Sequence, residues 1–309
     1  MKNKIPTTIF SGFLGSGKTT IISHLVKILQ DRGEQVVYIK NEIGDTDIDT
    51  KVLQGQGIKT RELLNGCICC TLVGPFISSI NEVVDTFNPD RILIEASGAA
   101  DPSALALMVS SHPLLERDGV IAIVDVVNFT GYSDLSTTTQ NQTKFTDLII
   151  FNKGELVDLK QKQVVVGYVR ELNTHSPIVE APEGKISPDI VFGINHAELD
   201  ALLKKSENHT HSDHISTDKI ESFTITTHKK INTEDLKSFL KSIPKNIFRA
   251  KGLVTSTDNK RFIFNTVGDR TTFLETKNTQ PDNVLVFIGY QANRYEEQAQ
   301  TQLNSLFKE

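Results

Sequence analysis

The chain has 309 residues, 38% of them hydrophobic, which is enough to bury the core of one large domain and a smaller one. A net charge of -5 and a pI near 5.9 exclude the basic footprint of a nucleic-acid or anionic-membrane binder. No stretch approaches the ~18 apolar residues of a membrane span, and the N-terminus lacks the apolar run of a signal peptide, so we expect a cytoplasmic protein without such partners.

The first part of the chain alternates apolar strand patterns with helical ones. A β-rich run at residues 7–11 predicts a strand, and the apolar spacing over 17–29 predicts a helix beyond a glycine loop. Later apolar runs predict strands at 35–39, 91–94, 120–124 and 147–151, with helical spacing at 76–87 and 157–172. Continuous apolar strands alternating with helices indicate an α/β fold with a mainly parallel, doubly wound sheet covered on both faces.

A polar stretch separates this part from the last third of the chain. Residues 204–218 read KKSENHTHSDHISTD and predict a linker between domains at 1–203 and 219–309. Beyond it, strands are predicted at 220–226, 252–256, 261–266 and 284–288, and helices at 232–242 and 294–307. This order favours a small α+β domain, mainly antiparallel.

The loop between the first strand and helix matches G-x-x-x-x-G-K-[ST], the phosphate-loop pattern of NTPases. Its backbone N–H groups are expected to surround a β-phosphate, with Lys18 on the β- and γ-oxygens and the Thr19 hydroxyl on Mg²⁺. The predicted nucleotide-binding residues here are Gly12, Gly15, Ser16, Gly17, Lys18, Thr19 and Thr20.

A carboxylate ends the apolar strand predicted at 91–94. Because the carboxyl ends of parallel strands line the nucleotide crevice, we expect Glu95 to orient the Mg²⁺ shell or a water, and Gly98 to sense the γ-phosphate. With Lys18, these form the predicted catalytic set. An exposed glutamate after a strand is the ordinary alternative.

The sequence Asn152-Lys153-Gly154-Glu155 follows the strand predicted at 147–151 and resembles the guanine motif N-K-x-D. Asn152, Lys153 and Glu155 are therefore predicted base-binding residues. The carboxylate is one methylene longer than in the motif, which leaves strict guanine specificity open.

All the cysteines of the chain, Cys67, Cys69 and Cys70, lie within one hexapeptide, GCICCT. In a reducing compartment such clustering favours metal or redox chemistry over a disulfide framework. Thiolates select Zn²⁺ or Cu(I) over Mg²⁺. A three-cysteine set needs a fourth ligand, such as Glu42, a histidine, water or a partner's side chain, which favours exchange over permanent binding. A redox thiol and a buried cysteine group are the alternatives.

A second candidate metal site lies in the polar linker, where His209, His211 and His214 bring three imidazoles into six residues. A solvated linker is the alternative.

Together, GFLGSGKTT, the sequence Asn41-Glu42-Ile43-Gly44, GCICCT, EASGAADP and the NKGE loop resemble the CobW family of P-loop GTPases. Residues 248–252, FRAKG, resemble the signature of that family's C-terminal domain. The resemblance implies a GTP-hydrolysing metallochaperone with GTP, Mg²⁺ and Zn²⁺, in which Glu42 and the cysteines form the metal site and a metal-requiring client protein is the partner. We expect slow turnover without a partner, since the sequence identifies no arginine finger beyond proximity.

Several alternatives stay open. They are a zinc store or sensor without a productive GTPase cycle, a chaperone for cobalt, nickel or iron, and a small-molecule kinase. The sequence leaves a homo-oligomeric state undecided, and it names Arg61 and Arg91 as arginine-finger candidates by proximity alone. Ile43 and Asp45 depart from the family's usual phenylalanine and glutamate, which puts a role for Asp45 in doubt.

Overall fold

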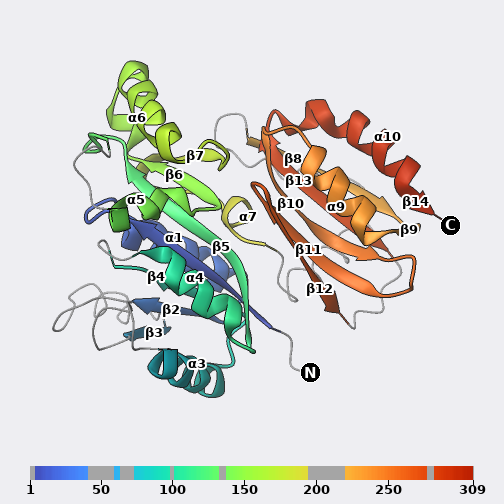
Figure 1. The fold of residues 1–309 in the computed structure, drawn as a ribbon, viewed down its shortest axis with the longest axis horizontal. Helices are drawn as coiled ribbons and strands as arrows, with labels where there is room; N and C mark the ends of the chain where they lie inside the picture. Colours follow the sequence, from blue (N-terminus) through green and yellow to red (C-terminus); the bar gives the residue numbers. More distant parts are fainter. Residues whose placement is uncertain are drawn as a thin grey trace. The chain divides into compact units, whose positions relative to one another are not determined.

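The computed structural model describes residues 4–40, 59–62, 73–97, 101–131, 137–193, 220–276 and 282–308. The chain divides into two compact units, Met1–Phe192 and Gly193–Glu309 (Figure 1). The linker predicted at 204–218 lies outside the described residues, so the sequence-based domain bounds stay a prediction.

The first unit is built on a seven-stranded sheet in the order β3-β2-β4-β1-β5-β6-β7, in which every pair is parallel. This confirms the predicted α/β class. The strands are β1 (Ile5–Gly12), β2 (Val36–Lys40), β3 (Lys59–Glu62), β4 (Arg91–Glu95), β5 (Leu115–Asp125), β6 (Leu148–Asn152) and β7 (Ile178–Ala181).

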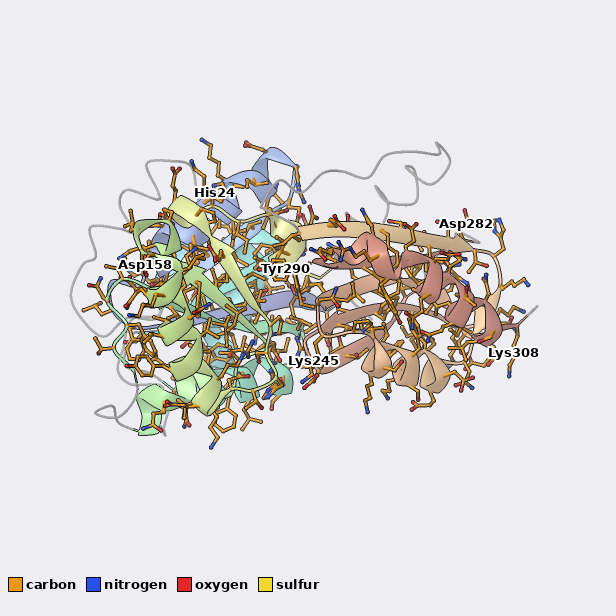
Figure 2. All side chains as sticks on the ribbon, turned by 90° about the horizontal axis from the view of Figure 1, so that it is seen from above. His24, Asp158, Lys245, Asp282, Tyr290 and Lys308 are labelled. Atoms are coloured by element: carbon orange, nitrogen blue, oxygen red, sulfur yellow. The ribbon has the colours of Figure 1, made fainter. Side chains whose placement is uncertain are left out.

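The helices of this unit cover both faces of the sheet, as Figure 1 shows. They are α1 (Lys18–Asp31), α3 (Val73–Phe87), α4 (Pro102–Ser111), α5 (Thr137–Lys144), α6 (Leu159–Leu172) and α7 (Pro188–Val191), with 3-10 turns η1 (Gly154–Leu156) and η2 (Pro182–Gly184). Helices α3 and α4 pack on the face that holds Ile39 and Ile94, whereas α1 lies over the opposite face. Asp158, labelled in Figure 2, begins α6 by accepting the backbone N–H of Gln161 at 2.8 Å.

The order of the strands shows at which edge of this sheet a ligand crevice is expected. The chain runs from β1 to β2 on one side and returns through β4 to β5 on the other, so β4 and β5 flank β1. In parallel α/β sheets, such a reversal opens a crevice at the carboxyl ends of the strands. The phosphate loop after β1 lies at this edge.

The second unit is a five-stranded antiparallel sheet in the order β12-β11-β10-β13-β8, with a short β14-β9 pair. The predicted α+β class is confirmed. Its elements are β8 (Ile220–Thr227), β9 (Lys230–Ile231), α9 (Thr233–Ser242), β10 (Ile247–Thr255), β11 (Arg261–Val267), β12 (Arg270–Thr276), β13 (Asn283–Tyr290), η3 (Ala292–Tyr295), α10 (Glu296–Leu306) and β14 (Phe307–Lys308).

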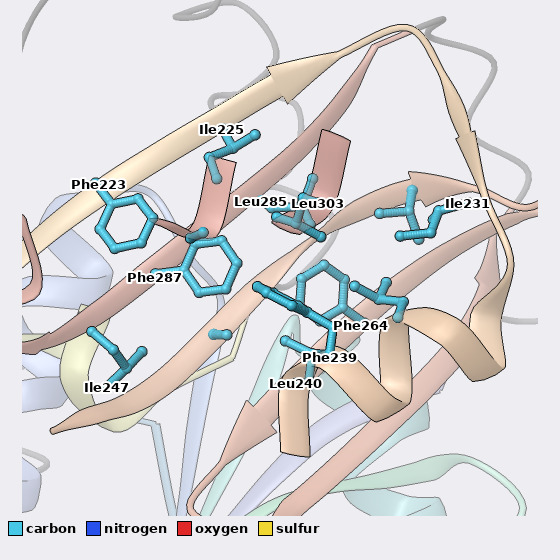
Figure 3. Close-up of a cluster of buried hydrophobic side chains, with 14 of the residues drawn as sticks. Phe223, Ile225, Ile231, Phe239, Leu240, Ile247, Phe264, Leu285, Phe287 and Leu303 are labelled. Atoms are coloured by element: carbon cyan, nitrogen blue, oxygen red, sulfur yellow. The ribbon is translucent and has the colours of Figure 1, made fainter. Parts of the chain in front are cut away.

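The core of this unit lies between one face of the sheet and the two helices α9 and α10 (Figure 3). The rings of Phe223 and Phe287 stack with centroids 4.9 Å apart, and Phe239 from α9 meets Phe287 edge-on at 6.1 Å. Gly252 explains part of the FRAKG signature, because a Cβ there would lie 2.1 Å from the carbonyl oxygen of Val284 on β13. Any larger residue would push the two strands apart.

Candidate functional site

The phosphate loop owes its shape to three glycines with left-handed or related φ angles. Gly12, Gly15 and Gly17 have φ values of 140°, 76° and 93°, which L side chains rarely adopt. A Cβ on Gly12 would meet the carbonyl oxygen of Ile123 at 2.3 Å, and one on Gly17 would meet the Asn152 amide at 2.2 Å. The loop is therefore tightly held between β5 and β6.

Helix α1 begins at this loop without a side-chain cap, since Gly17 occupies the N-cap position. Its first backbone N–H groups and its helix dipole are thus directed at the loop, which is the arrangement that binds phosphate. Ser16 is buried and Gly15 is exposed.

Lys18 and Thr19, the first residues of α1, contact the phosphate loop and the end of β4. The Lys18 ammonium donates to the carbonyl oxygens of Gly12 and Phe13 at 2.9 and 3.1 Å. The Thr19 hydroxyl lies 3.3 and 3.2 Å from the two carboxylate oxygens of Glu95 and donates to that group. The structure thus places Lys18, Thr19 and Glu95 at the same loop, as expected from the sequence.

Glu95 ends β4 in a buried position, only 3% exposed. Burial raises the pKa of this carboxyl group above its ordinary value, although hydrogen bonds from Tyr38 and Thr19 and the charges of Lys18 and Lys40 oppose that rise. The ordinary alternative of an exposed glutamate after a strand is wrong for Glu95. Tyr38 was not singled out by sequence reasoning.

Asn152 and Lys153 hold the phosphate loop from its other side. The Asn152 amide donates to the carbonyl oxygen of Ser16 at 2.9 Å. Lys153 has a left-handed φ of 61° and donates to the carbonyl oxygen of Gly15 at 3.1 Å and to Asp125 at 2.6 Å. The predicted base loop and the phosphate loop are one connected structure.

Asp125 is a site residue that sequence reasoning missed. It ends β5 and accepts hydrogen bonds from Lys153 and from the Asn128 side chain. Burial acts to raise the pKa of Asp125, but these bonds and two from backbone N–H groups outweigh it, so the pKa lies below its ordinary value. The sequence pattern could have identified Asp125, because it ends an apolar strand in the same way as Glu95, at the same edge of the sheet.

Glu155 lies in η1, beside the turn η2. Its exposed carboxylate accepts the backbone N–H of Glu183 at 3.0 Å. Gly184 follows, and a Cβ there would lie 3.2 Å from the methyl group of Thr20 on α1. The structure therefore gathers Glu155, the η2 turn and Thr20 around the same end of α1.

Arg91 is wrong as an arginine-finger candidate. It begins β4 and is fully buried, with an ion pair to Asp118 at 2.9 Å and a second, at 3.5 Å, to Glu34. Glu95 lies four residues further along the strand, about 13 Å away at the usual rise per residue. Arg61, the other candidate, lies in β3.

Several predicted site residues lie outside the described part of the chain: Glu42, Cys67, Cys69, Cys70, Gly98, His209, His211 and His214. Among the residues that the structure does describe, no cluster of three His, Cys, Asp or Glu side chains could hold a metal ion. Within the same residues, no helix has the length and apolar character to cross a membrane.

A glycine loop after the central strand of a parallel sheet, with Lys18, Thr19 and Glu95 around it, defines a P-loop nucleotide-binding protein. Residues 6–180 match the family model for the CobW/HypB/UreG nucleotide-binding domain, and residues 220–307 match the cobalamin synthesis protein cobW C-terminal domain. The chain belongs to the CobW/HypB/UreG family, which confirms the resemblance seen in its sequence.

Relatives of known function are similar over about two thirds of the chain. The zinc chaperone YjiA of Escherichia coli (strain K12) is 28% identical over 218 residues, covering 68% of this chain and 67% of that protein. The zinc chaperone CobW of Sinorhizobium sp is 30% identical over 261 residues, covering 72% and 73%. A crystal structure of the Zn(II)-bound YjiA GTPase matches 99% of this chain and 100% of its own at 21% identity, with a TM-score of 0.46.

Proposed function

We propose that this protein is a GTP-hydrolysing metallochaperone that binds zinc through Cys67, Cys69 and Cys70 and delivers it to client proteins under the control of its nucleotide state. The observation that carries the nucleotide half is the pair of contacts at the phosphate loop, in which Lys18 bonds the loop carbonyl of Gly12 and Thr19 bonds Glu95. The metal half is supported by the cysteine sequence and by relatives named as zinc chaperones.

The enzyme class predicted from the sequence, a GTPase, is confirmed by relatives whose names describe GTPases. One is the zinc-regulated GTPase metalloprotein activator 1 of Schizosaccharomyces pombe, 29% identical over 59% of this chain and 47% of that protein. In the proposed cycle, Lys18 binds the β- and γ-phosphate oxygens and Glu155 binds the base. Asn152 and Lys153 hold the phosphate loop in place for both contacts.

The residues around Thr19 fit Mg²⁺. A hydroxyl and a carboxylate are the oxygen donors this ion prefers, and the two lie within 3.3 Å of each other. When bound, Mg²⁺ would neutralise charge on the phosphates. Thr19 would be the direct ligand, and Glu95 would hold the hydroxyl proton so that the oxygen faces the ion.

Zinc is the cargo in this proposal. The cysteines and Glu42 lie in the sequence between Lys40, which ends β2, and Val73, which begins α3, whereas Glu95 ends the neighbouring strand β4. We expect nucleotide state to set zinc affinity, and hydrolysis to reset it. Reciprocity then requires zinc to change nucleotide affinity by the same factor.

Changing all three cysteines to serine is expected to abolish the tight binding of one zinc ion per chain under reducing conditions, because serine does not supply a thiolate. Zinc competition titrations in the GDP and GTP-analogue states measure this. The matched control replaces His209, His211 and His214 and is expected to keep the tight site. Equal zinc affinity in both nucleotide states would exclude the coupling, and a zinc store or sensor would then be the better description.

Changing Asp125 to alanine is expected to lower GTP affinity about 10-fold, since Lys153 loses the carboxylate that holds it and charge-assisted bonds contribute about 1.5–3 kcal/mol. Fluorescence titration with a labelled GTP analogue gives the affinity. Asp158→Ala is the control, because it removes the α6 cap in the same unit and should lower stability by about 1 kcal/mol without changing GTP affinity. If Asp125→Ala binds GTP as tightly as the unmodified chain, the contact between Asp125 and Lys153 does not contribute to GTP binding.

A further inference from the structure

The Glu95 carboxylate is surrounded by polar side chains from two elements, and only one of those elements belongs to the phosphate loop and its helix. Lys18 and Thr19 come from α1. Tyr38 and Lys40 come from β2, where they are 1% and 5% exposed. The Tyr38 hydroxyl donates a hydrogen bond to Oε2 of Glu95.

The sheet register explains why Tyr38 reaches this site. Strand β2 pairs with β4 in parallel, and Lys40 lies opposite Glu95. Side chains alternate along a strand, so Tyr38, two residues earlier, shares a face with Lys40 and Glu95. Helix α1 contacts β2 and β4 on this face, which brings Thr19 to the same carboxylate.

The hydrogen-bond pattern gives Tyr38 a specific task. Thr19 donates its only hydroxyl proton to Glu95, so the lone pairs of its oxygen face away from that carboxylate and toward the loop. This orientation holds only while the carboxylate stays in place. Tyr38 donates from the side of β2 and thereby fixes the carboxylate that orients Thr19.

We propose that Tyr38 is a positioning residue for the magnesium–nucleotide site, acting through Glu95 on the Thr19 hydroxyl. It does not touch the nucleotide in this scheme. The inference rests on the proposed function, because it assumes that Mg²⁺ and a guanine nucleotide bind at the phosphate loop. It adds β2 to the elements that build that site.

The test is Tyr38→Phe, which removes the hydroxyl and keeps the buried ring. Binding of a fluorescent GDP analogue is measured by anisotropy with excess Mg²⁺ and again with EDTA. We expect the gain in affinity that Mg²⁺ provides to fall about 10-fold, the size of one hydrogen bond to a charged group. Affinity in EDTA should change less than about 2-fold. The difference between the affinities with Mg²⁺ and with EDTA measures the contribution of magnesium to binding, and it does not require GTP hydrolysis.

Tyr168→Phe is the matched control, since it removes a tyrosine hydroxyl in the same unit and keeps a ring that packs on Phe129. A double-mutant cycle with Glu95→Gln separates positioning from packing. If Tyr38 acts through Glu95, the second substitution should add little to the loss caused by the first.

Two results would overturn the proposal. One is an unchanged magnesium gain in Tyr38→Phe, and the other is an equal loss with and without Mg²⁺, which would make the role purely structural. Loss of cooperative unfolding in Tyr38→Phe would likewise show that the role of Tyr38 is purely structural. Failure of the unmodified chain to bind guanine nucleotide is a separate result, which would refute the proposed function itself.

Discussion

Lys18→Ala is expected to lower GTP affinity by about 100-fold, which corresponds to about 2.7 kcal/mol of binding free energy. Lys18 places a cation at the phosphate loop, where its ammonium already donates to two carbonyl oxygens. In the proposed complex the same ammonium binds the β- and γ-phosphate oxygens, and charge-assisted bonds of this kind are among the strongest in proteins.

The affinity is measured by titration with a labelled GTP analogue in the presence of Mg²⁺. Lys27→Ala is the matched control, because Lys27 lies on the same helix with an exposed side chain and should leave affinity unchanged. The thermal unfolding of both variants shows whether the loop still folds. A Lys18 variant that is folded and binds GTP as tightly as the unmodified chain would remove the phosphate-loop assignment.

Arg91→Ala is expected to destabilise the first unit by about 3–5 kcal/mol, since removing one partner of a buried ion pair leaves the other charges without compensation. Arg91, Glu34 and Asp118 are all buried. The arginine also lies over the ring of Phe192, with its guanidinium carbon 4.6 Å from the ring centroid. Urea unfolding measured by circular dichroism tests the prediction.

Arg32→Ala is the control for this measurement. Arg32 makes a bidentate pair with Asp189 at 3.2 and 3.0 Å, but the two side chains are 39% and 33% exposed, so the loss should stay within about 1 kcal/mol. Arg91→Met combined with Asp118→Asn and Glu34→Gln should recover part of the stability, because no charge is then left buried. Equal losses for the two single arginine variants would contradict the buried-pair explanation.

Local sequence predicted the phosphate loop well. Glycine spacing, a preceding strand and a following helix are encoded within residues 5–31, and the structure has them as β1, the loop and α1. The strand ends at Glu95 and Asn152 were also readable, because apolar runs stop there. Whether these residues bind nucleotide stays a prediction.

The position of Asp118 illustrates what the sequence left undecided. Thr7 pairs with Arg117, whereas Thr8 pairs with Gly119, so the register shifts by one residue at Asp118. Asp118 forms an ion pair there with Arg91, which begins β4. No local sequence pattern marks this pairing, so the sequence offered Arg91 as an arginine finger although it is a buried ion-pair partner.

The sequence by itself determined the class of this protein, because the phosphate loop, the strand ends and the cysteine cluster are each contained in a few consecutive residues. Only the tertiary structure decided which distant residues support them. Tyr38 meets Glu95, Asp125 meets Lys153, and Asn152 meets Ser16 because strand order and register place them together. Those contacts depend on pairing between strands that are far apart along the chain, and hydrophobic periodicity specifies that a strand exists without specifying its neighbour.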